Sequence, residues 1–203
     1  MKHLFLKTTL LFFTITLSNC EEQTEEETWN PQLPPITQNG ANTFGAIVDG
    51  RVFAPKDSYT FTPGSSLTKG LEVLVGQNFF NSNGNDKWFI RANNFKDTPG
   101  TYIYIYIPSL IGEIKNHTIQ ESDGSDGNER SNLPHSHIYS RIINRGEYRS
   151  FENSGKLIFS KINIMNGIYS GTFSVKLKNK DNENEIIEIR NGRFDINLNT
   201  VYN

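Results

Sequence analysis

The side chains that could do chemistry in this chain are few, and its histidines come first. His135 and His137 are two positions apart, so in a strand both imidazoles would lie on one face. With His117 or Asp123 they could supply the three or four ligands that zinc requires. Pro134 precedes the pair and a loop surrounds it, which favours a surface pair with no role. We therefore expect no metal site, and His135 and His137 are the candidates if one exists.

Two other patterns bear on ion binding and catalysis. Residues 123–129 have the oxygen ligands and glycines that calcium loops favour, but they lack the D-x-[DN]-x-[DN]-G spacing and the distant bidentate glutamate, so a flexible loop is the better interpretation. The chain has no G-x-S-x-G nucleophile motif, and among 22 acidic residues a pair of carboxylates can always be imagined. We expect no catalytic residue, no cofactor and no enzymatic activity.

A tyrosine triplet is the candidate ligand-binding feature. Tyr102, Tyr104 and Tyr106 alternate with isoleucines in residues 101–107, the clearest two-residue repeat in the chain. Isoleucine is buried more often than tyrosine, so the isoleucines should face the core and the tyrosines should lie outward or under a covering loop. Exposed rings could stack on sugars or other flat ligands. A cross-strand aromatic ladder that only stabilises the sheet is the stronger interpretation.

The chain begins with an export signal. An apolar run at residues 8–17 is about half as long as a bilayer span, so residues 1–19 are expected to be a signal peptide that is removed. The sequence Leu-Ser-Asn-Cys at residues 17–20 resembles the lipobox of bacterial lipoproteins, although Asn19 departs from the usual small residue. The resemblance implies that Cys20, the only cysteine, is lipidated. The alternative, an ordinary secretory signal, would leave Cys20 as a free thiol.

An acidic stretch follows Cys20. Five of the seven residues 21–27 are glutamates, and such a block cannot bury apolar surface, so residues 20–41 should form a solvated tether that also contains prolines. Acidic residues directly behind the lipid cysteine resemble the surface-export signal of Bacteroidetes lipoproteins. That resemblance implies a protein of the outer membrane, anchored through the lipid on Cys20 and exposed at the cell surface. A spacer with no addressing role is the alternative.

The composition fits one β-rich domain. The 203 residues are enough for one domain and short for two. Phe, Tyr, Ile, Asn and Gly are abundant, which favours strands and turns, and a single cysteine cannot form a disulfide within the chain. The formal net charge is −2, and no basic patch or nucleic-acid motif is evident. Nucleic acid is therefore not an expected partner.

Short strand patterns run through the rest of the chain. No stretch longer than ten residues keeps the apolar stripe of a helix, and closely spaced strands point to an antiparallel sandwich or a barrel-like sheet. Strands are predicted at residues 44–48, 51–53, 71–75, 88–92, 101–107, 138–143, 156–162, 171–177, 186–189 and 193–198.

Turn signals connect several of these strands. The Asp-Gly pair at residues 49–50 suits a type I′ hairpin turn, and the Asn-Gly pair at residues 166–167 marks another turn. The Asn-Gly pair at residues 191–192 is predicted to close a third hairpin. Across that hairpin, Ile187 and Ile189 would face Phe194 and Ile196.

Motifs at both ends of the domain resemble an uncharacterised domain of Bacteroidetes lipoproteins. They read LPPxTxxGxNTFGxxVxGxxF over residues 33–53, SGTF at residues 170–173 and NGRFD at residues 191–195. The resemblance spans most of residues 33–198, and many members of that family carry a cysteine where this chain has Ala46. The motif positions are turn and core residues, so the resemblance implies a location and a fold but brings no activity and no catalytic residues.

These observations predict a lipoprotein signal peptide at residues 1–19, a lipidated tether at residues 20–41 and a single all-β domain at residues 42–203. We expect a non-enzymatic surface lipoprotein, anchored in the membrane, that binds a glycan or an envelope protein or serves as an accessory part of an envelope assembly. The alternative is a small surface hydrolase acting on a polysaccharide or envelope substrate. Such an enzyme should have a pocket with convergent ionisable groups.

Overall fold

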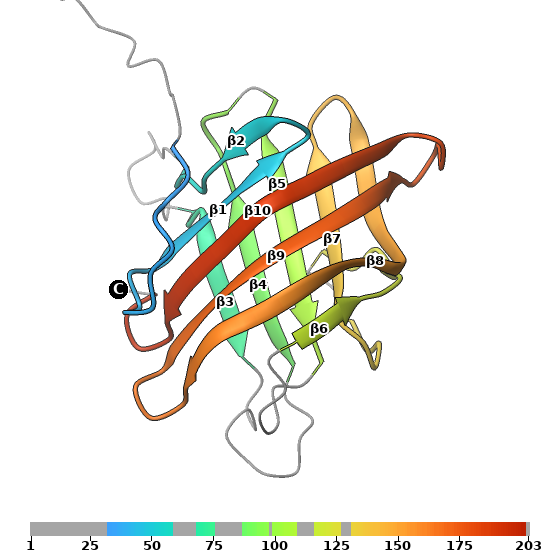
Figure 1. Cartoon of the computed structure of the whole chain (residues 1–203). Helices are drawn as coiled ribbons and strands as arrows, with labels where there is room; N and C mark the ends of the chain where they lie inside the picture. The colour runs from blue at the N-terminus through green and yellow to red at the C-terminus, as the bar shows by residue number, and fades with distance from the viewer. Residues whose placement is uncertain are drawn as a thin grey trace, which may run out of the picture.

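The computed structural model of the chain describes residues 32–58, 68–75, 87–97, 99–108, 116–126 and 131–201. In this part of the chain ten strands form one antiparallel sheet, which confirms the predicted all-β class (Figure 1). The strands are β1 Thr43–Val48, β2 Arg51–Phe53, β3 Leu71–Val75, β4 Trp88–Asn93, β5 Thr101–Ile107, β6 Asn116–Ile119, β7 His137–Ile142, β8 Gly146–Asn163, β9 Ile168–Asn179 and β10 Ile186–Asn197. Among the described residues there is no helix long and apolar enough to cross a membrane.

The two ends of the domain meet near one edge of the sheet. The strand order is β2-β1-β10-β9-β8-β7-β5-β4-β3, and β6 pairs with β8 beside this path. The hairpin of β1 and β2 therefore lies against β10, the last strand. This pairing places the N-terminal and C-terminal sequence motifs next to each other.

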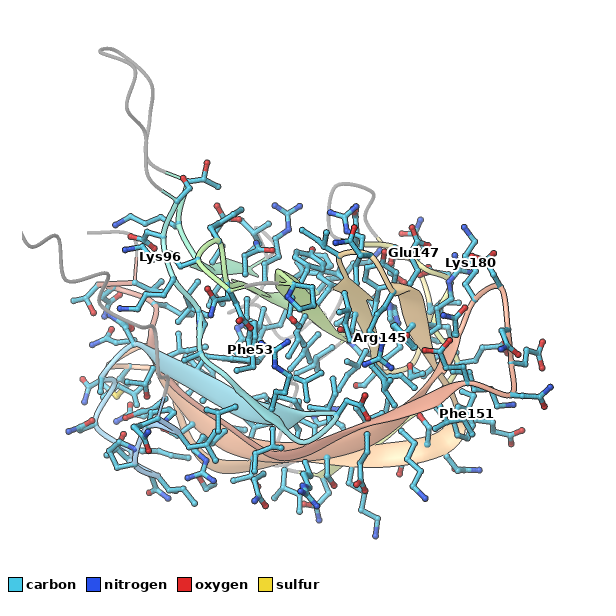
Figure 2. All side chains as sticks on the ribbon, turned by 90° about the horizontal axis from the view of Figure 1, so that it is seen from above. Phe53, Lys96, Arg145, Glu147, Phe151 and Lys180 are labelled. Carbon is cyan, nitrogen blue, oxygen red and sulfur yellow. The ribbon has the colours of Figure 1, made fainter. Side chains whose placement is uncertain are left out.

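The sheet curls into a half-barrel because its longest strand is bent. β8 has 18 residues, and its register against β9 shifts between Ser150 and Gly155 and again between Phe159 and Lys161. Such bulges bend a strand and increase its twist. The bend divides the sheet into a back layer of β3, β4, β5 and β7 and a front layer of β1, β10, β9 and β8 (Figure 1). Seen from above, side chains fill the space between the two layers (Figure 2).

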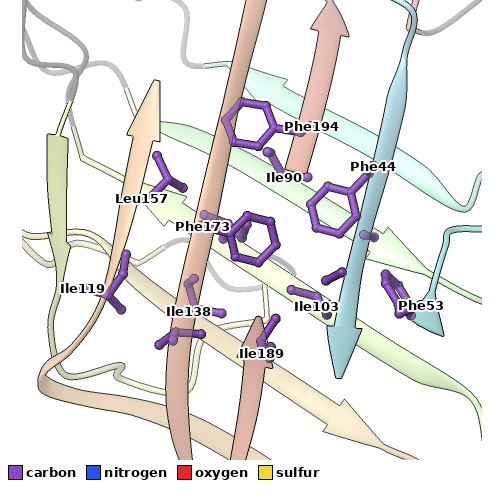
Figure 3. Close-up of a cluster of buried hydrophobic side chains, with 14 of the residues drawn as sticks. Phe44, Phe53, Ile90, Ile103, Ile119, Ile138, Leu157, Phe173, Ile189 and Phe194 are labelled. Carbon is purple, nitrogen blue, oxygen red and sulfur yellow. The ribbon is translucent and has the colours of Figure 1, made fainter. Parts of the chain in front are cut away.

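The main hydrophobic core lies between these layers. Figure 3 shows Phe173 and Phe194 of the front layer meeting Ile90 and Ile138 of the back layer. The isoleucines of β5 are fully buried in the same core, which confirms their predicted inward orientation: Ile103, Ile105 and Ile107.

Two of the predicted turns are confirmed. Asp49 and Gly50 have φ values of 48° and 84°, as a type I′ turn requires, and they join β1 to β2. Gly167 has a φ of 65° in the turn between β8 and β9, and its amide donates to the carbonyl of Ile164 at 3.2 Å.

The third predicted turn is wrong. β10 runs without interruption through the Asn-Gly pair, and β9 pairs with it on both sides of that pair. The residues expected to face each other across a hairpin therefore lie on one strand: Ile187, Ile189, Phe194 and Ile196.

The Asn-Gly pair forms a bulge in β10. The register of β10 against β9 shifts between Ile189 and Gly192, and Asn191 takes a φ of 51° there. An Asn-Gly pair suits a bulge for the same reason that it suits a turn, since Asn tolerates a positive φ. Gly192 itself has no positive φ; a Cβ at this position would meet carbon atoms of the Phe173 ring at 2.5 Å. Close packing, and not a turn, requires glycine at this position.

The segment before β1 is part of the domain. The carboxylate of Asp195 on β10 is buried and accepts five hydrogen bonds, four of them from this segment. The donors are Thr37 Oγ1 at 2.6 Å, Asn39 N at 3.1 Å, Gly40 N at 2.9 Å, Ala41 N at 3.2 Å and Ser170 Oγ at 2.7 Å. Residues 37–41 are thus fixed to the sheet, so the expected boundary between tether and domain at residue 42 lies too late in the chain.

One strand lies where the sequence pattern predicted none. β6 pairs with residues 155–158 of β8 and extends the front layer. It has four residues, of which only Ile119 is buried. So short a strand shows no hydrophobic alternation that could reveal it in the sequence.

Candidate functional site

The tyrosine triplet belongs to a second, smaller hydrophobic cluster on the outer face of the back layer. Tyr104 and Tyr106 are fully buried and Tyr102 is half-buried. Phe89 of β4 and Tyr139 of β7 flank them, with the Phe89 ring centroid 5.7 Å from that of Tyr104 and 5.5 Å from that of Tyr106. The rings form a cross-strand ladder. They do not form the exposed stacking surface that was the alternative.

Residues 121–126 and 131–136 cover this ladder. The Tyr106 hydroxyl donates to the carbonyl of Leu133 at 3.0 Å, and the Tyr102 hydroxyl donates to the carbonyl of Asp126. Leu133 also packs against the rings. Burial raises the pKa of Tyr102, so its hydroxyl stays protonated and acts as a donor. The tyrosines therefore hold the covering segment in place.

Asp123, Ser125 and His137 meet under the same segment. Nε2 of His137 lies 3.6 Å from Asp123 Oδ1 and 3.5 Å from Ser125 Oγ. Burial lowers the pKa of His137 to about 4, although the Asp123 carboxylate opposes this, so the imidazole is neutral at pH 7. Burial alone would raise the pKa of Asp123, but hydrogen bonds from Ser125 and Ser131 outweigh it and lower that pKa. The contact therefore joins a carboxylate to a neutral imidazole.

These three residues do not have the geometry of a serine–histidine–carboxylate relay. In such a relay the serine and the carboxylate contact different nitrogens of the imidazole. Here both face Nε2, and Ser125 Oγ donates directly to Asp123 Oδ1 at 2.6 Å. Nδ1 of His137 is buried and has no hydrogen-bond partner among the described residues, and the same holds for the hydroxyl of Tyr104. The arrangement ties the covering segment to β7.

The histidines considered as zinc ligands make separate contacts. Of the pair, only His137 lies in β7; His135 precedes this strand, and its Nε2 donates to the carbonyl of Glu121 at 2.9 Å. His117, on β6, pairs through Nδ1 with Ser136 Oγ at 3.1 Å. Within the described ranges, no three His, Cys, Asp or Glu side chains are grouped as a metal site would need.

A second candidate is a cleft of about 180 Å³ where the two layers part at one end of the half-barrel. Ion pairs join the layers across it, Arg145 with Asp49 at 2.7 Å and Arg51 with Asp97 at 3.0 Å. Figure 2 looks onto this end, with Phe53 and Arg145 between the layers. The charges at the rim neutralise each other, so the cleft offers a ligand mainly its apolar walls: Val48, Val52, Phe53, Pro99 and Ile142.

The third candidate is the outer face of the front layer, which is basic. Residues 155–163 of β8, together with β9 and β10, contain six cationic side chains and only two carboxylates, Glu188 and Asp195. Asp195 is buried beneath the N-terminal segment. Within the described part of the chain, none of the six cations forms an ion pair. The cations are Lys156, Lys161, Lys176, Lys178, Arg190 and Arg193.

Strand alternation turns these cations outward. Their neighbours Leu157, Val175, Leu177 and Ile189 are buried in the main core, so the residues between them point to the opposite side of the sheet. Two of the cations hold the N-terminal segment, since Arg193 Nη1 donates to the Pro34 carbonyl at 3.2 Å and Lys161 Nζ donates to the Gln38 carbonyl at 2.6 Å. The Nζ atom of Lys178 lies 4.7 Å from the ring centroid of Phe151. The remaining three are exposed: Lys156, Lys176 and Arg190.

A groove of about 310 Å³ runs across this basic face. One wall is Ile36 of the N-terminal segment and the other is Ile158 of β8; these side chains are 63% and 43% exposed. Thr172 and Ser174 of β9 line the floor beside the bulge at Gly192, where no side chain projects. Lys156 and Arg193 add positive charge to the lining. The groove thus combines cations, hydroxyls and two aliphatic walls, and we call it the cationic groove.

The sequence contains only a faint signal for the cationic groove. Lysine alternates with apolar residues at positions 175–178, which places charge on one face of a single strand. The sequence shows no basic run because the cations are spread over three strands. Only the pairing of β8, β9 and β10 brings them together.

Residues 1–31, with Cys20 and the acidic stretch, lie outside the described residues, so the lipid anchor and the solvated tether stay predictions. Comparison of the chain with protein-family models, with curated proteins and with solved structures found no match in any of the three. The relation to Bacteroidetes lipoproteins therefore stays a prediction from the motifs.

Proposed function

We propose that this protein is a lipid-anchored surface lipoprotein of the outer membrane whose β domain is a non-enzymatic binding module. The cationic groove and the exposed cations around it form its binding surface for a partner in the envelope or outside the cell. The observation that supports this most directly is the collection of Lys156, Lys176 and Arg190 on one face without ion-pair partners among the described residues.

Glu188 lies opposite Lys176 on the neighbouring strand, but this face still carries six cations and a single exposed carboxylate, so a net repulsion between its positive charges remains. An anionic partner relieves the repulsion and gains charge-assisted hydrogen bonds. The chain as a whole does not share this bias, since its formal net charge is −2. Separation of positive charge onto one face of an otherwise slightly acidic protein is what a binding surface for anions requires.

The predicted anchor is compatible with such a role. The described chain starts at Gln32, and Ile36 already forms a wall of the cationic groove. Gln32 lies twelve positions after Cys20, and an extended chain spans at most about 3.5 Å per residue, so the tether reaches about 40 Å at most. A lipidated Cys20 would hold the domain near the membrane while leaving its basic face free to turn outward.

The anchor and the binding surface are tested separately. Mass spectrometry of the native protein should find lipid on Cys20 as the first residue; an unmodified Cys20 or an intact Met1 would refute the anchor. For binding, the labelled mature protein is added to cells from which its gene has been deleted. A variant with Lys156→Gln, Lys176→Gln and Arg190→Gln should bind these cells much less.

A matched control removes the same charge elsewhere, with Lys69→Gln, Arg141→Gln and Lys180→Gln. These residues lie outside the cationic groove. The control variant should bind like the unchanged protein. Equal binding by both variants, or no binding by the unchanged protein, would refute the proposed surface.

A further inference from the structure

We propose that the ligand of the cationic groove is a linear polysaccharide that carries carboxylate groups, such as a polyuronate. This inference rests on the function proposed above and names the chemical class of its ligand. Three features of the groove favour an acidic sugar chain over other anions.

The first feature is the pairing of charge with hydroxyl groups. Thr172 and Ser174 lie on the floor between Lys156 on β8 and Arg193 on β10. A uronate unit carries a carboxylate and several hydroxyls on one ring, so it can contact a cation and a floor hydroxyl at the same time. A carboxylate on a flexible peptide side chain has no hydroxyl to offer the floor.

The second feature is the pair of aliphatic walls. Ile36 and Ile158 remain largely exposed on either side of the groove, although they are large apolar side chains. A sugar ring has C–H groups on its faces as well as hydroxyls at its rim, and contact with such groups would cover the two isoleucines. A layer of phosphate headgroups offers no comparable surface, and the wall formed by the N-terminal segment recesses the floor from a flat membrane.

The third feature is the extent of the charge beyond the groove. Lys176 lies two residues beyond Ser174 on β9, and Arg190 lies next to the bulge on β10. Residues two apart in a strand are separated by about 7 Å and neighbouring strands by about 4.8 Å. The cations therefore extend beyond the groove on two strands, with the carboxylate of Glu188 opposite Lys176, at spacings that a polymer charged at each sugar can follow. A single small anion would leave Lys176 and Arg190 without a partner.

Binding is measured by titrating the mature protein in detergent with labelled short oligogalacturonate. The methyl-esterified form of the same oligomer is the matched probe, because it keeps the sugar and loses the charge. We expect the unesterified oligomer to bind, with affinity that falls as salt is raised, and the esterified oligomer to bind at least about tenfold more weakly. Equal binding of the two forms would overturn the proposal.

Two sets of variants separate charge from sugar recognition. The variant with Lys156→Gln, Lys176→Gln and Arg190→Gln should bind oligogalacturonate about tenfold more weakly, and the single change Lys156→Gln should give a smaller loss. The change Thr172→Val keeps the shape and removes the hydroxyl, and it should weaken oligogalacturonate binding about threefold or more. Unchanged affinity in the triple variant, or in Thr172→Val, would overturn the proposal.

Other polyanions serve as competitors. Poly-L-glutamate, duplex DNA and phosphatidylglycerol vesicles should each bind more weakly than oligogalacturonate, and Thr172→Val should leave their binding unchanged. Tighter binding by poly-L-glutamate would overturn the proposal, since the glutamates at residues 21–27 of this chain would then be the better occupant. If the triple variant loses binding to cells but oligogalacturonate does not bind, the proposed function stands and the ligand class is wrong.

Discussion

Thr37 donates its hydroxyl hydrogen to the carboxylate of Asp195 at 2.6 Å, although 158 residues separate the two in the sequence. The same carboxylate accepts amide hydrogens from residues 39–41. Burial alone would raise the pKa of Asp195, but its hydrogen bonds outweigh this and lower the pKa below its usual value. Thr37 and Gly40 belong to the N-terminal motif and Asp195 to the C-terminal one. Their shared role is to fasten the start of the domain to its last strand.

The change Asp195→Asn should lower the free energy of unfolding by about 2 kcal/mol or more. It removes a charged acceptor from several hydrogen bonds in a buried site, and each bond to a charged group is worth about 1.5 to 3 kcal/mol. Urea denaturation of both proteins measures the loss. Glu188→Gln, on an exposed residue of the same strand, is the control and should change stability by less than about 0.5 kcal/mol.

The Asp195 carboxylate also predicts that the stability of the folded protein falls at acidic pH. Because the pKa of Asp195 is lower in the folded protein than in the unfolded chain, the stabilisation is complete above about pH 4 and is lost as pH falls below that value. The unchanged protein should lose stability through this range, and Asp195→Asn should lose less of it. Identical acid curves for the two proteins would contradict the role assigned to this carboxylate.

Gly192→Ala should destabilise the protein by about 1 to 3 kcal/mol because the new Cβ overlaps the Phe173 ring. Asn191→Gly, one position earlier where φ is positive, should change stability by less than about 1 kcal/mol. Thermal denaturation distinguishes the two. The steric explanation further requires that Gly192→Ala costs less when Phe173 is replaced by leucine. If Gly192→Ala destabilises the Phe173→Leu protein by the same amount, the cause is the backbone conformation and not overlap with the ring.

Tyr104→Phe and Tyr106→Phe should have opposite consequences although the two rings are neighbours on β5. The Tyr106 hydroxyl donates to Leu133, so its removal should cost about 1 kcal/mol. The Tyr104 hydroxyl is buried without a partner among the described residues, so its removal should be neutral or stabilising. Melting temperatures of the two variants test this. A loss in Tyr104→Phe as large as that in Tyr106→Phe would mean that the hydroxyl has a partner in solution.

His137 should make stability fall between about pH 6.5 and pH 4. Burial lowers the pKa of His137 to about 4, so the unfolded chain binds a proton in this range and the folded protein does not. Stability therefore declines as pH falls, by an amount on the order of 3 kcal/mol.

Urea denaturation at a series of pH values measures this slope. His137→Phe keeps an aromatic ring beside Tyr106, whose ring centroid lies 4.8 Å from that of His137, and it should flatten the slope. His135→Gln, within the covering segment, should keep the slope. A slope that persists in His137→Phe would show that another group titrates.

Much of the strand content could be predicted from the sequence because it depends on neighbouring residues. Alternation over residues 101–107 was enough to place the isoleucines inside, since side chains in a strand point to opposite faces in turn. Asp49 and Gly50 identified their turn because few residues accept a positive φ. The Asn-Gly pair at residues 191–192 was misjudged for the same reason. A turn and a bulge need the same backbone conformation, and only the pairing of β10 with β9 on both sides distinguishes them.

The sequence left open whether a loop covers the tyrosines, and neither the covering residues nor the cationic groove could be predicted, because both depend on contacts between distant residues. Alternation shows that Tyr104 and Tyr106 share a face, but it does not show that residues 121–126 and 131–136 lie over that face. Likewise, the sequence alone indicates that Lys156, Lys176 and Arg190 are ordinary solvated charges. Only the pairing of β8, β9 and β10 shows that they share one face. By itself the sequence determined most strands and predicted an export signal before the lone cysteine, because each of these features is encoded within a short stretch of chain. The register between strands decided which charges meet and which rings are covered, since register is set by the packing of the whole sheet.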